Sequence, residues 1–152
     1  MTKKHNSHIE LDNFWPYQVV VLADQISRYT VSVAKNEAGL NSSQWRVLAA
    51  VADKPGRTSA EVTAVTPMDK TIVSRAVKSL IDSGLIEKTQ TENDRRRMSL
   101  TPTAQGQKIY SNIARELNRT MMNSSTAQTT PDSFIKMLKE FSQKMDDIDT
   151  KH

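Results

Sequence analysis

The fold is decided by the stretch from Thr58 to Thr103, which reads TSAEVTAVTPMDKTIVSRAVKSLIDSGLIEKTQTENDRRRMSLTPT. Thr58 and Glu61 have the spacing of a capping box, in which two side chains satisfy backbone N–H groups at the start of a helix. This spacing predicts a short helix that ends near Val65. The residues after it then decide what kind of unit the helix belongs to.

A second helix is expected directly after the first. Thr66 stands at its N-cap position and Pro67 in its first turn, where a proline costs no hydrogen bond. The helix should run to about Ser83, because Gly84 can take the left-handed conformation that ends many helices. Two helices joined by so short a connection predict a helix-turn-helix unit.

The second helix has two chemically different faces. Apolar residues at spacings of three and four should pack inward, namely Val73, Ala76, Val77, Leu80 and Ile81. The opposite face carries hydrogen-bond donors, namely Lys70, Thr71, Ser74, Arg75 and Lys78. Donors near the N-terminus suit a helix that lies in the DNA major groove and reaches base edges. Taken alone, such a row can also be a solvated helix face.

A β-hairpin should follow the second helix. Residues 85–90 favour a strand, residues 91–95 a polar turn and residues 97–100 a partner strand. The tip is charged and carries Asp94, Arg95, Arg96 and Arg97. A hairpin at this place is a wing, and an arginine on its tip can enter a narrow minor groove, where the potential is negative. A hairpin whose arginines only increase solubility is the alternative.

Together these segments resemble the MarR family of winged-helix transcriptional regulators. The likeness is carried by residues 68–77, Leu80, residues 84–88, Asp94 to Arg96 and Thr103-x-x-Gly106, with residues 39–48 resembling the approach to the motif. Pro102 and Val62 stand where the family usually has leucine, which leaves the expected fold intact. The resemblance implies that Ser74 and Arg75 contact DNA. It also implies that Asp94 steadies the wing while Arg96 reaches the minor groove.

The charge distribution agrees with a nucleic-acid partner. The net charge is +4, and residues 42–114 hold eleven Lys and Arg against seven Asp and Glu, while both ends are balanced. The excess of positive charge therefore lies on the motif, as expected for a DNA-binding surface.

Composition excludes several other classes of protein. There is no cysteine, so disulfides and thiolate metal sites are excluded, and His5, His8 and His152 lie too near the ends to form a metal cluster. No glycine-rich phosphate loop or catalytic triad pattern occurs, so we expect neither an enzyme nor a cofactor. The longest apolar run, residues 47–52, is too short to cross a bilayer, and the N-terminus lacks the apolar segment of a signal peptide. We therefore expect a cytoplasmic protein that does not bind membranes.

Long helices should flank the motif. One is expected from about Asp12 to Ala38, another from Asn41, which caps it, to Asp53, a third from Thr103 to about Asn123, and a last one after Thr130 and Pro131. The last helix has an apolar seam of Phe134, Leu138, Phe141, Met145 and Ile148. Such a seam can pack on the chain's own helices, but the three helices outside the DNA-binding unit at residues 41–102 exceed what so small a core can cover. We therefore expect a homodimer that binds a palindromic operator with half-sites roughly 10 bp apart.

These inferences combine into one expected architecture. It is a mainly α single domain over residues 1–152, with a winged helix-turn-helix unit at residues 41–102 and dimerisation helices at residues 11–39 and 103–149. The family resemblance further implies a repressor that a small aromatic or phenolic acid releases from DNA. Candidate residues for that ligand, each of which can equally serve packing or the surface, are Trp15, Tyr17, Arg28, Tyr29, Trp45 and Arg46. A winged helix that binds proteins, or one that binds chromosomal DNA of any sequence, is the alternative.

Overall fold

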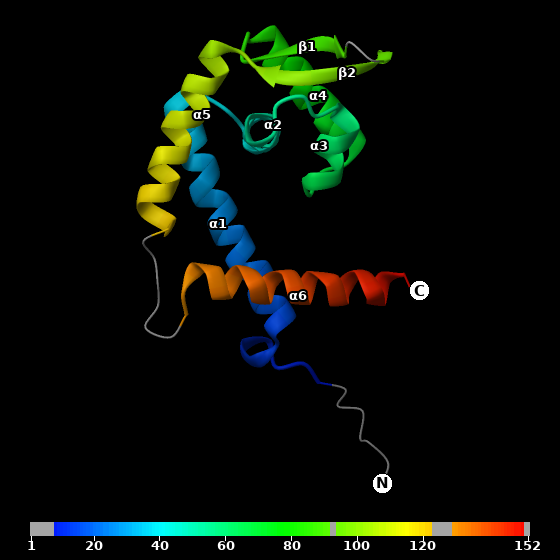
Figure 1. The fold of residues 1–152 in the computed structure, drawn as a ribbon. Coiled ribbons are helices and arrows are strands. Elements are labelled where there is room, and N and C mark those ends of the chain that lie inside the picture. The colour runs from blue at the N-terminus through cyan, green and yellow to red at the C-terminus, as the bar shows by residue number, and fades with distance from the viewer. Residues whose placement is uncertain (1–7, 92–93, 123–128, 151–152) are drawn as a thin grey trace. The chain divides into compact units, whose positions relative to one another are not determined.

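The computed structural model describes residues 8–91, 94–122 and 129–150, and the side chains of residues 91–96 lie outside that description. Its elements, in order, are η1 (Leu11–Asn13), α1 (Trp15–Ala38), α2 (Ser42–Asp53), α3 (Ser59–Val65), α4 (Lys70–Asp82), β1 (Ile86–Thr91), β2 (Asp94–Pro102), α5 (Ala104–Leu117), the π-helical turn η2 (Asn118–Met122) and α6 (Pro131–Asp149) (Figure 1). This mainly helical fold with one small hairpin confirms the predicted winged helix-turn-helix with long terminal helices. The chain divides into two compact units, Met1–Ile113 and Ala114–His152, which are described separately.

Both predicted capping boxes are present. The Asn41 side chain accepts a hydrogen bond from the Gln44 backbone N–H (2.9 Å), and the Gln44 side chain accepts one from the Asn41 N–H (2.9 Å). At the start of α3, Thr58 Oγ1 accepts from the Glu61 N–H (3.2 Å) and Glu61 Oε2 accepts from the Thr58 N–H (2.7 Å). These local patterns define where α2 and α3 begin.

The predicted start of the second helix was wrong. The N-cap of α4 is Asp69, whose carboxylate accepts a hydrogen bond from the Ile72 N–H (2.8 Å), so the helix begins at Lys70. The Thr66 hydroxyl instead donates to the Val62 carbonyl (2.8 Å) at the end of α3. Thr66 is thus engaged by the helix before it, and the negative charge of Asp69 favours the positive end of the α4 dipole.

The hairpin is longer than predicted. Its strands pair in antiparallel register from Ile86 opposite Pro102 to Gln90 opposite Met98, and β2 already begins at Asp94 rather than at Arg97. Cross-strand pairing therefore extends the strand into a charged run that shows no alternation of polar and apolar residues.

Two devices fix the base of the hairpin to the helices. Backbone hydrogen bonds join the segment before α3 to β2: Gly56 N–H to the Leu100 carbonyl (2.8 Å) and Leu100 N–H to the Arg57 carbonyl (2.8 Å). Gly106 lets α5 approach the start of β1, because a Cβ at this position would lie 1.8 Å from the Leu85 carbonyl oxygen. The wing thus leaves the helical body from a firmly held base.

The core lies among α2, α3, α4, the base of the hairpin and α5. Its largest fully buried side chains are Leu48, Leu80, Ile86, Leu100, Ile113, Val47, Val51, Val62 and Val73. The Gln44 amide also donates to the Ser79 hydroxyl (2.7 Å), which ties the N-terminus of α2 to α4. These contacts hold α4 by its apolar face.

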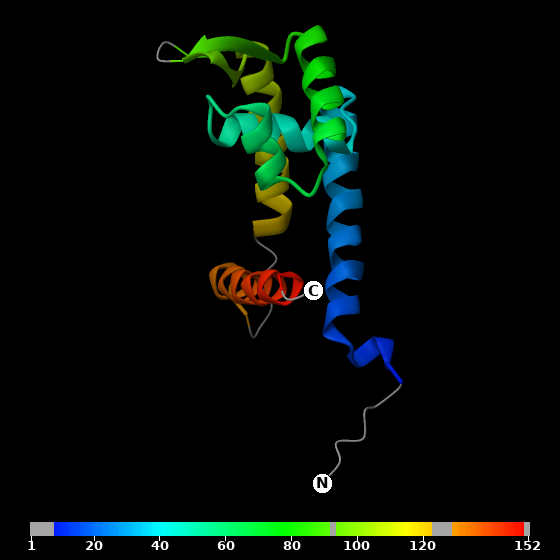
Figure 2. The same ribbon diagram turned by 90° about the vertical axis from the view of Figure 1, so that its right-hand side faces the viewer.

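The terminal helices differ from this core. Helix α1 starts at Trp15 rather than at Asp12, because Pro16 fits only in a first turn, and it ends at Gly39 with φ 66°. Its buried residues, Val33 and Ala34, are near its C-terminal end. The N-terminal half of α1 projects away from α2, α3 and α4 in both ribbon views (Figures 1 and 2).

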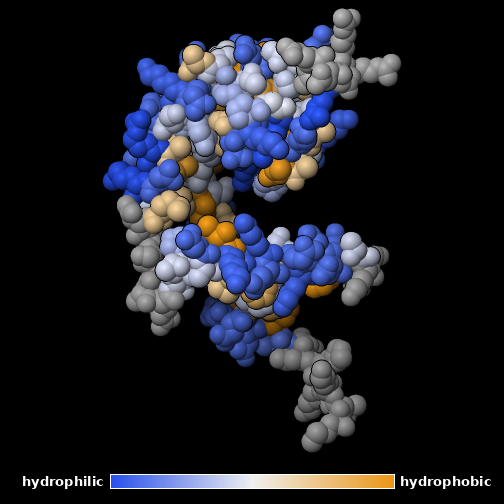
Figure 3. All heavy atoms as spheres, in the orientation of Figure 1, coloured by the Kyte–Doolittle hydropathy of each residue, from blue (hydrophilic) through white to orange (hydrophobic). Residues whose placement is uncertain are grey.

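Large apolar side chains remain exposed on α1 and α6. Those at and near α1 are Phe14, Trp15, Tyr17, Val19, Val20, Leu22 and Ile26, and those on α6 are Phe134, Ile135, Met137, Leu138, Phe141, Met145 and Ile148. The space-filling view shows hydrophobic atoms at the surface of α1 (Figure 3). Among the described segments, no helix is both long enough and apolar enough to span a bilayer.

Candidate nucleic-acid interface

Helix α4 separates its two faces as the sequence predicted, except that Ile81, which was expected to pack inward, is only half-buried. Val73, Ala76, Val77 and Leu80 are buried against the body. The predicted donors are all exposed, namely Lys70, Thr71, Ser74, Arg75 and Lys78. The helix is therefore held by one face and offers hydroxyl, ammonium and guanidinium groups on the other.

The α4 surface carries one more side chain, which the sequence analysis did not single out. Ile72 is 41% exposed, although it is large and apolar. Ile72 lies between the exposed Thr71 and the buried Val73. The spacing of apolar residues along the helix therefore did not assign Ile72 to either face. An apolar group beside donors is suited to contact the methyl group of thymine.

At the C-terminal end of the donor face, Lys78 is engaged within its own helix. Its ammonium group lies 2.7 Å from the Asp82 carboxylate, with both side chains well exposed. Such a surface pair adds little stability and exchanges readily for another anionic partner.

The wing is braced across its two strands. The hydroxyls of Thr89 on β1 and Ser99 on β2 are hydrogen-bonded at 3.0 Å. The predicted tip residues Asp94, Arg95 and Arg96 have side chains outside the described part of the chain, so only their backbone position on β2 is known.

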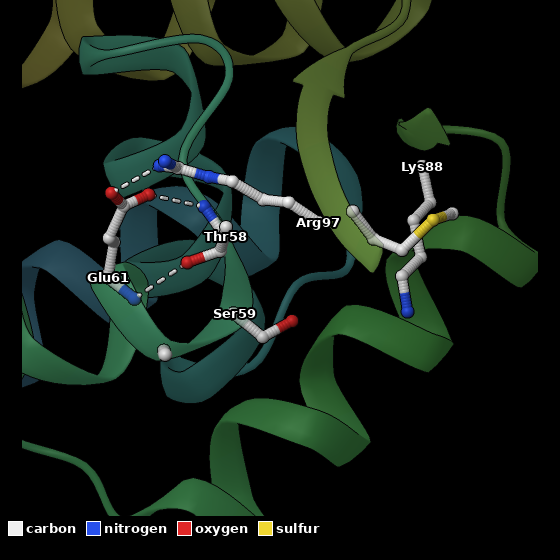
Figure 4. A pocket seen from close by; sticks show the side chains of 7 residues that line it. Thr58, Ser59, Glu61, Lys88 and Arg97 are labelled. Carbon is white, nitrogen blue, oxygen red and sulfur yellow. Dashed lines mark hydrogen bonds and ion pairs between the residues drawn. The ribbon is translucent and has the colours of Figure 1, made fainter. Parts of the chain in front are cut away.

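Arg97, also predicted to contact DNA, instead extends towards α3. Its guanidinium lies 2.6 Å from Glu61 Oε1 on α3 (Figure 4). The pair borders a hollow of about 490 Å³, whose other lining residues are Thr58, Ser59, Ala60, Lys88 and Met98. Figure 4 shows Lys88 lying away from the Glu61–Arg97 pair.

Glu61 is held in its charged form. The hydrogen bond from the Thr58 backbone N–H, followed by the interactions with Arg97, lowers the pKa of Glu61 below its ordinary value of 4.5. Because the folded pKa is the lower one, the stabilisation is present above the unfolded pKa and is lost as pH falls through the folded value. The Glu61 carboxylate that pairs with Arg97 is therefore charged at neutral pH.

The six candidate ligand residues do not converge on one place. Trp45 is buried and stacks with Tyr110, with ring centroids 6.0 Å apart. Arg46 donates to the Ser27 hydroxyl (3.2 Å). Both line a hollow of about 340 Å³ together with Ala49, Ala50, Asp53, Arg57, Val65, Thr66 and Pro67.

The other four candidates lie along α1. Arg28 forms an ion pair with Asp24, and its neighbour Tyr29 is half-buried. Trp15 and Tyr17 are in the first turn of α1, about 20 Å from Arg28 at roughly 1.5 Å per residue. Trp15 and Tyr17 therefore cannot share one small site with Arg28 and Tyr29.

Comparison with known proteins matches this architecture. The family model described as MarR family matches residues 38–97, which hold the helix-turn-helix and most of the hairpin. Over these residues the chain is similar to the MarR family of transcriptional regulators. The earlier resemblance of the motif residues is thereby confirmed.

Individual relatives extend the MarR-family match beyond the motif. An uncharacterised HTH-type transcriptional regulator of Bacillus subtilis, YybA, is 30% identical over 77 residues, 51% of each chain, so the match spans about half the length of that curated relative. A MarR/EmrR family regulator from Acinetobacter has the same fold, with a TM-score of 0.78, 22% identity and coverage of 91% of this chain and 99% of that chain. A putative MarR family regulator from Listeria monocytogenes, solved in complex with 26mer DNA, has a TM-score of 0.67 and 26% identity over 86% of this chain and 85% of its own.

Proposed function

We propose that this chain is a sequence-specific regulator of transcription that binds double-stranded DNA. The observation that carries the proposal is α4, which buries Val73, Ala76, Val77 and Leu80 on one face and exposes a row of donors, with Ile72 among them, on the other. A helix held in this way by the body presents its side chains in a fixed register, as reading of base edges requires. The enzyme class finds no support, because the MarR family consists of regulators.

In this proposal α4 enters the major groove. Arg75 makes the bidentate contact with guanine for which its planar group is suited, and Ser74 bonds a neighbouring base or phosphate. Ile72 meets a thymine methyl group. Lys70, Thr71 and Lys78 contact the backbone, and the wing residues Asp94, Arg95 and Arg96 lie at the flanking minor groove.

The chain acts as a homodimer in the same proposal. Exposed apolar side chains on α1 and α6 support this, since a single small chain rarely leaves so much apolar surface uncovered. A two-fold dimer requires a palindromic operator, with half-sites roughly 10 bp apart. We also propose repression, on the resemblance alone because it is the usual mode in the family, and a cytoplasmic location.

A small aromatic acid is the proposed effector, and the hollow beside Trp45 and Arg46 is its proposed site. Arg57 lines the same hollow, where it pairs with Asp53 (3.0 Å), so a ligand carboxylate would take the place of Asp53 on this guanidinium. The turn of residues 65–67, which leads towards α4, also forms part of the wall. A ligand there would favour a conformation in which α4 fits DNA poorly. Calorimetry with aromatic carboxylates, with and without operator DNA, tests this; no binding and no change in DNA affinity would refute it.

Selection of binding sites from random duplex DNA tests the main proposal. A palindromic sequence should be enriched, and anisotropy titrations should give far tighter binding to it than to scrambled DNA. Salt-sensitive binding to every sequence alike would instead indicate phosphate contacts alone. No binding at all would favour a winged helix that binds a protein.

A further inference from the structure

Two contacts at different heights join the wing to the helical body. At the base, backbone hydrogen bonds connect Leu100 with Gly56 and Arg57. Three residues nearer the tip, about 10 Å along the strand, Arg97 pairs with Glu61 at 2.6 Å. The base contact lies where the hairpin starts, whereas the outer contact lies further along the strand, where it can influence the angle of the hairpin.

Glu61 is an unusually well-held partner for this outer contact. One carboxylate oxygen accepts the Thr58 N–H (2.7 Å) as part of the capping box, and the other accepts from Arg97 (2.6 Å). The residue that defines the start of α3 therefore also receives the wing (Figure 4). A side chain already ordered by its helix cap loses little further freedom when it binds the arginine.

We propose that Arg97 is a positioning residue, which sets the wing against α3 through Glu61, and is not a residue that contacts DNA. The inference rests on the proposed function, because it concerns how the wing meets the duplex. A half-exposed ion pair adds little to overall stability, but it restricts the angle of the hairpin before DNA arrives. DNA binding then avoids the cost of ordering the wing.

The first test needs no DNA. Glu61→Gln keeps the cap, because glutamine serves at this position of a capping box, but removes the charge that binds Arg97. Glu61→Gln and Arg97→Gln should both lower the NMR order parameters of the Gln90 and Met98 amides, while the proteins melt close to wild type. Glu87→Gln is the control, since that wing carboxylate contacts Thr101 within the hairpin. Unchanged order in both test variants would overturn the proposal.

The second test measures operator affinity. Glu61→Gln and Arg97→Gln should each weaken binding by about fivefold, equivalent to about 1 kcal/mol. The double variant should bind no more weakly than either single one, and Arg97→Lys, which can still pair with Glu61, should retain most of the affinity. Glu87→Gln should bind at least as well as wild type.

A direct DNA contact by Arg97 predicts a different pattern. Glu61→Gln would then leave binding unchanged or tighter, because a negative charge is lost and the arginine is released. Arg97→Gln would still weaken binding in the Glu61→Gln background. That pattern would overturn the proposal. Wild-type protein that prefers no DNA sequence would instead refute the proposed function, while the order parameters would still decide whether Arg97 anchors the wing.

Discussion

Helices α4 and α6 are both amphipathic, but the apolar face of α4 is buried and that of α6 is exposed. In α4, Val73 and Leu80 are completely buried, in contact with α2 and α3. In α6, which is described over its whole length, no residue is buried, and Leu138 remains 39% exposed. The same periodicity thus yields a core helix in one place and an exposed apolar seam in another. The core orients α4, whereas the exposed seam of α6 is the surface that a second copy covers in the proposed dimer.

The largest expected effect compares a leucine from each helix. Leu80→Ala should lower the free energy of unfolding by about 2–5 kcal/mol, because it leaves a cavity in a packed core. Leu138→Ala should destabilise by an amount that depends on protein concentration, because in the proposed dimer the seam is covered only when two chains associate. Urea denaturation at several concentrations measures both. A Leu138→Ala loss that is equal at every concentration would mean that α6 packs on its own chain.

A charge placed in the apolar seam of α6 tests the proposed dimer more directly. Leu138→Glu should shift sedimentation towards monomer and abolish operator binding, since a carboxylate cannot be buried there without a partner. Gln143→Glu, at an exposed position of the same helix, is the matched control and should leave the dimer intact. A stable monomeric variant that still binds the operator normally would refute the dimer.

The exposed face of α4 can be tested at one residue. Arg75→Ala should cost about 1–3 kcal/mol of binding free energy on the selected operator and relax the preference at one base position. Arg96→Ala should change preferences only at flanking positions, if the wing reads the minor groove. Anisotropy titrations on operator variants distinguish the two. An equal loss on random DNA would mean that Arg75 touches phosphate alone.

The start of α4 provides the smallest effect. Asp69→Ala should reduce the free energy of unfolding by about 1 kcal/mol, because the Ile72 N–H loses its cap. Thr66→Ala should cost less, since the Thr66 hydroxyl bonds only to a carbonyl at the end of α3. Thermal melts of the two variants would show the reverse order if Thr66 were the true N-cap.

The correct predictions concern positions with one favourable local arrangement, whereas the incorrect ones concern positions where two arrangements compete. The capping boxes of Asn41 and Thr58 and the two faces of α4 were predictable, because each depends on residues three or four apart. Thr66 was misassigned, because two local hydrogen-bonding options compete there and the neighbouring helix end decides between them. The start of β2 was misplaced, because pairing with β1 outweighs the polar character of the tip.

The sequence by itself determined the helices, the caps of α2 and α3, the hairpin, the charge excess on the motif and the resemblance of the motif to the MarR family. Only the tertiary structure decided that Arg97 meets Glu61, 36 residues away, and that Trp45 stacks with Tyr110 instead of joining Trp15 and Tyr17. The physical reason is distance along the chain. Local hydrogen bonds and helical periodicity depend on residues that are close in the sequence. Contacts between separate elements depend on how the whole core packs.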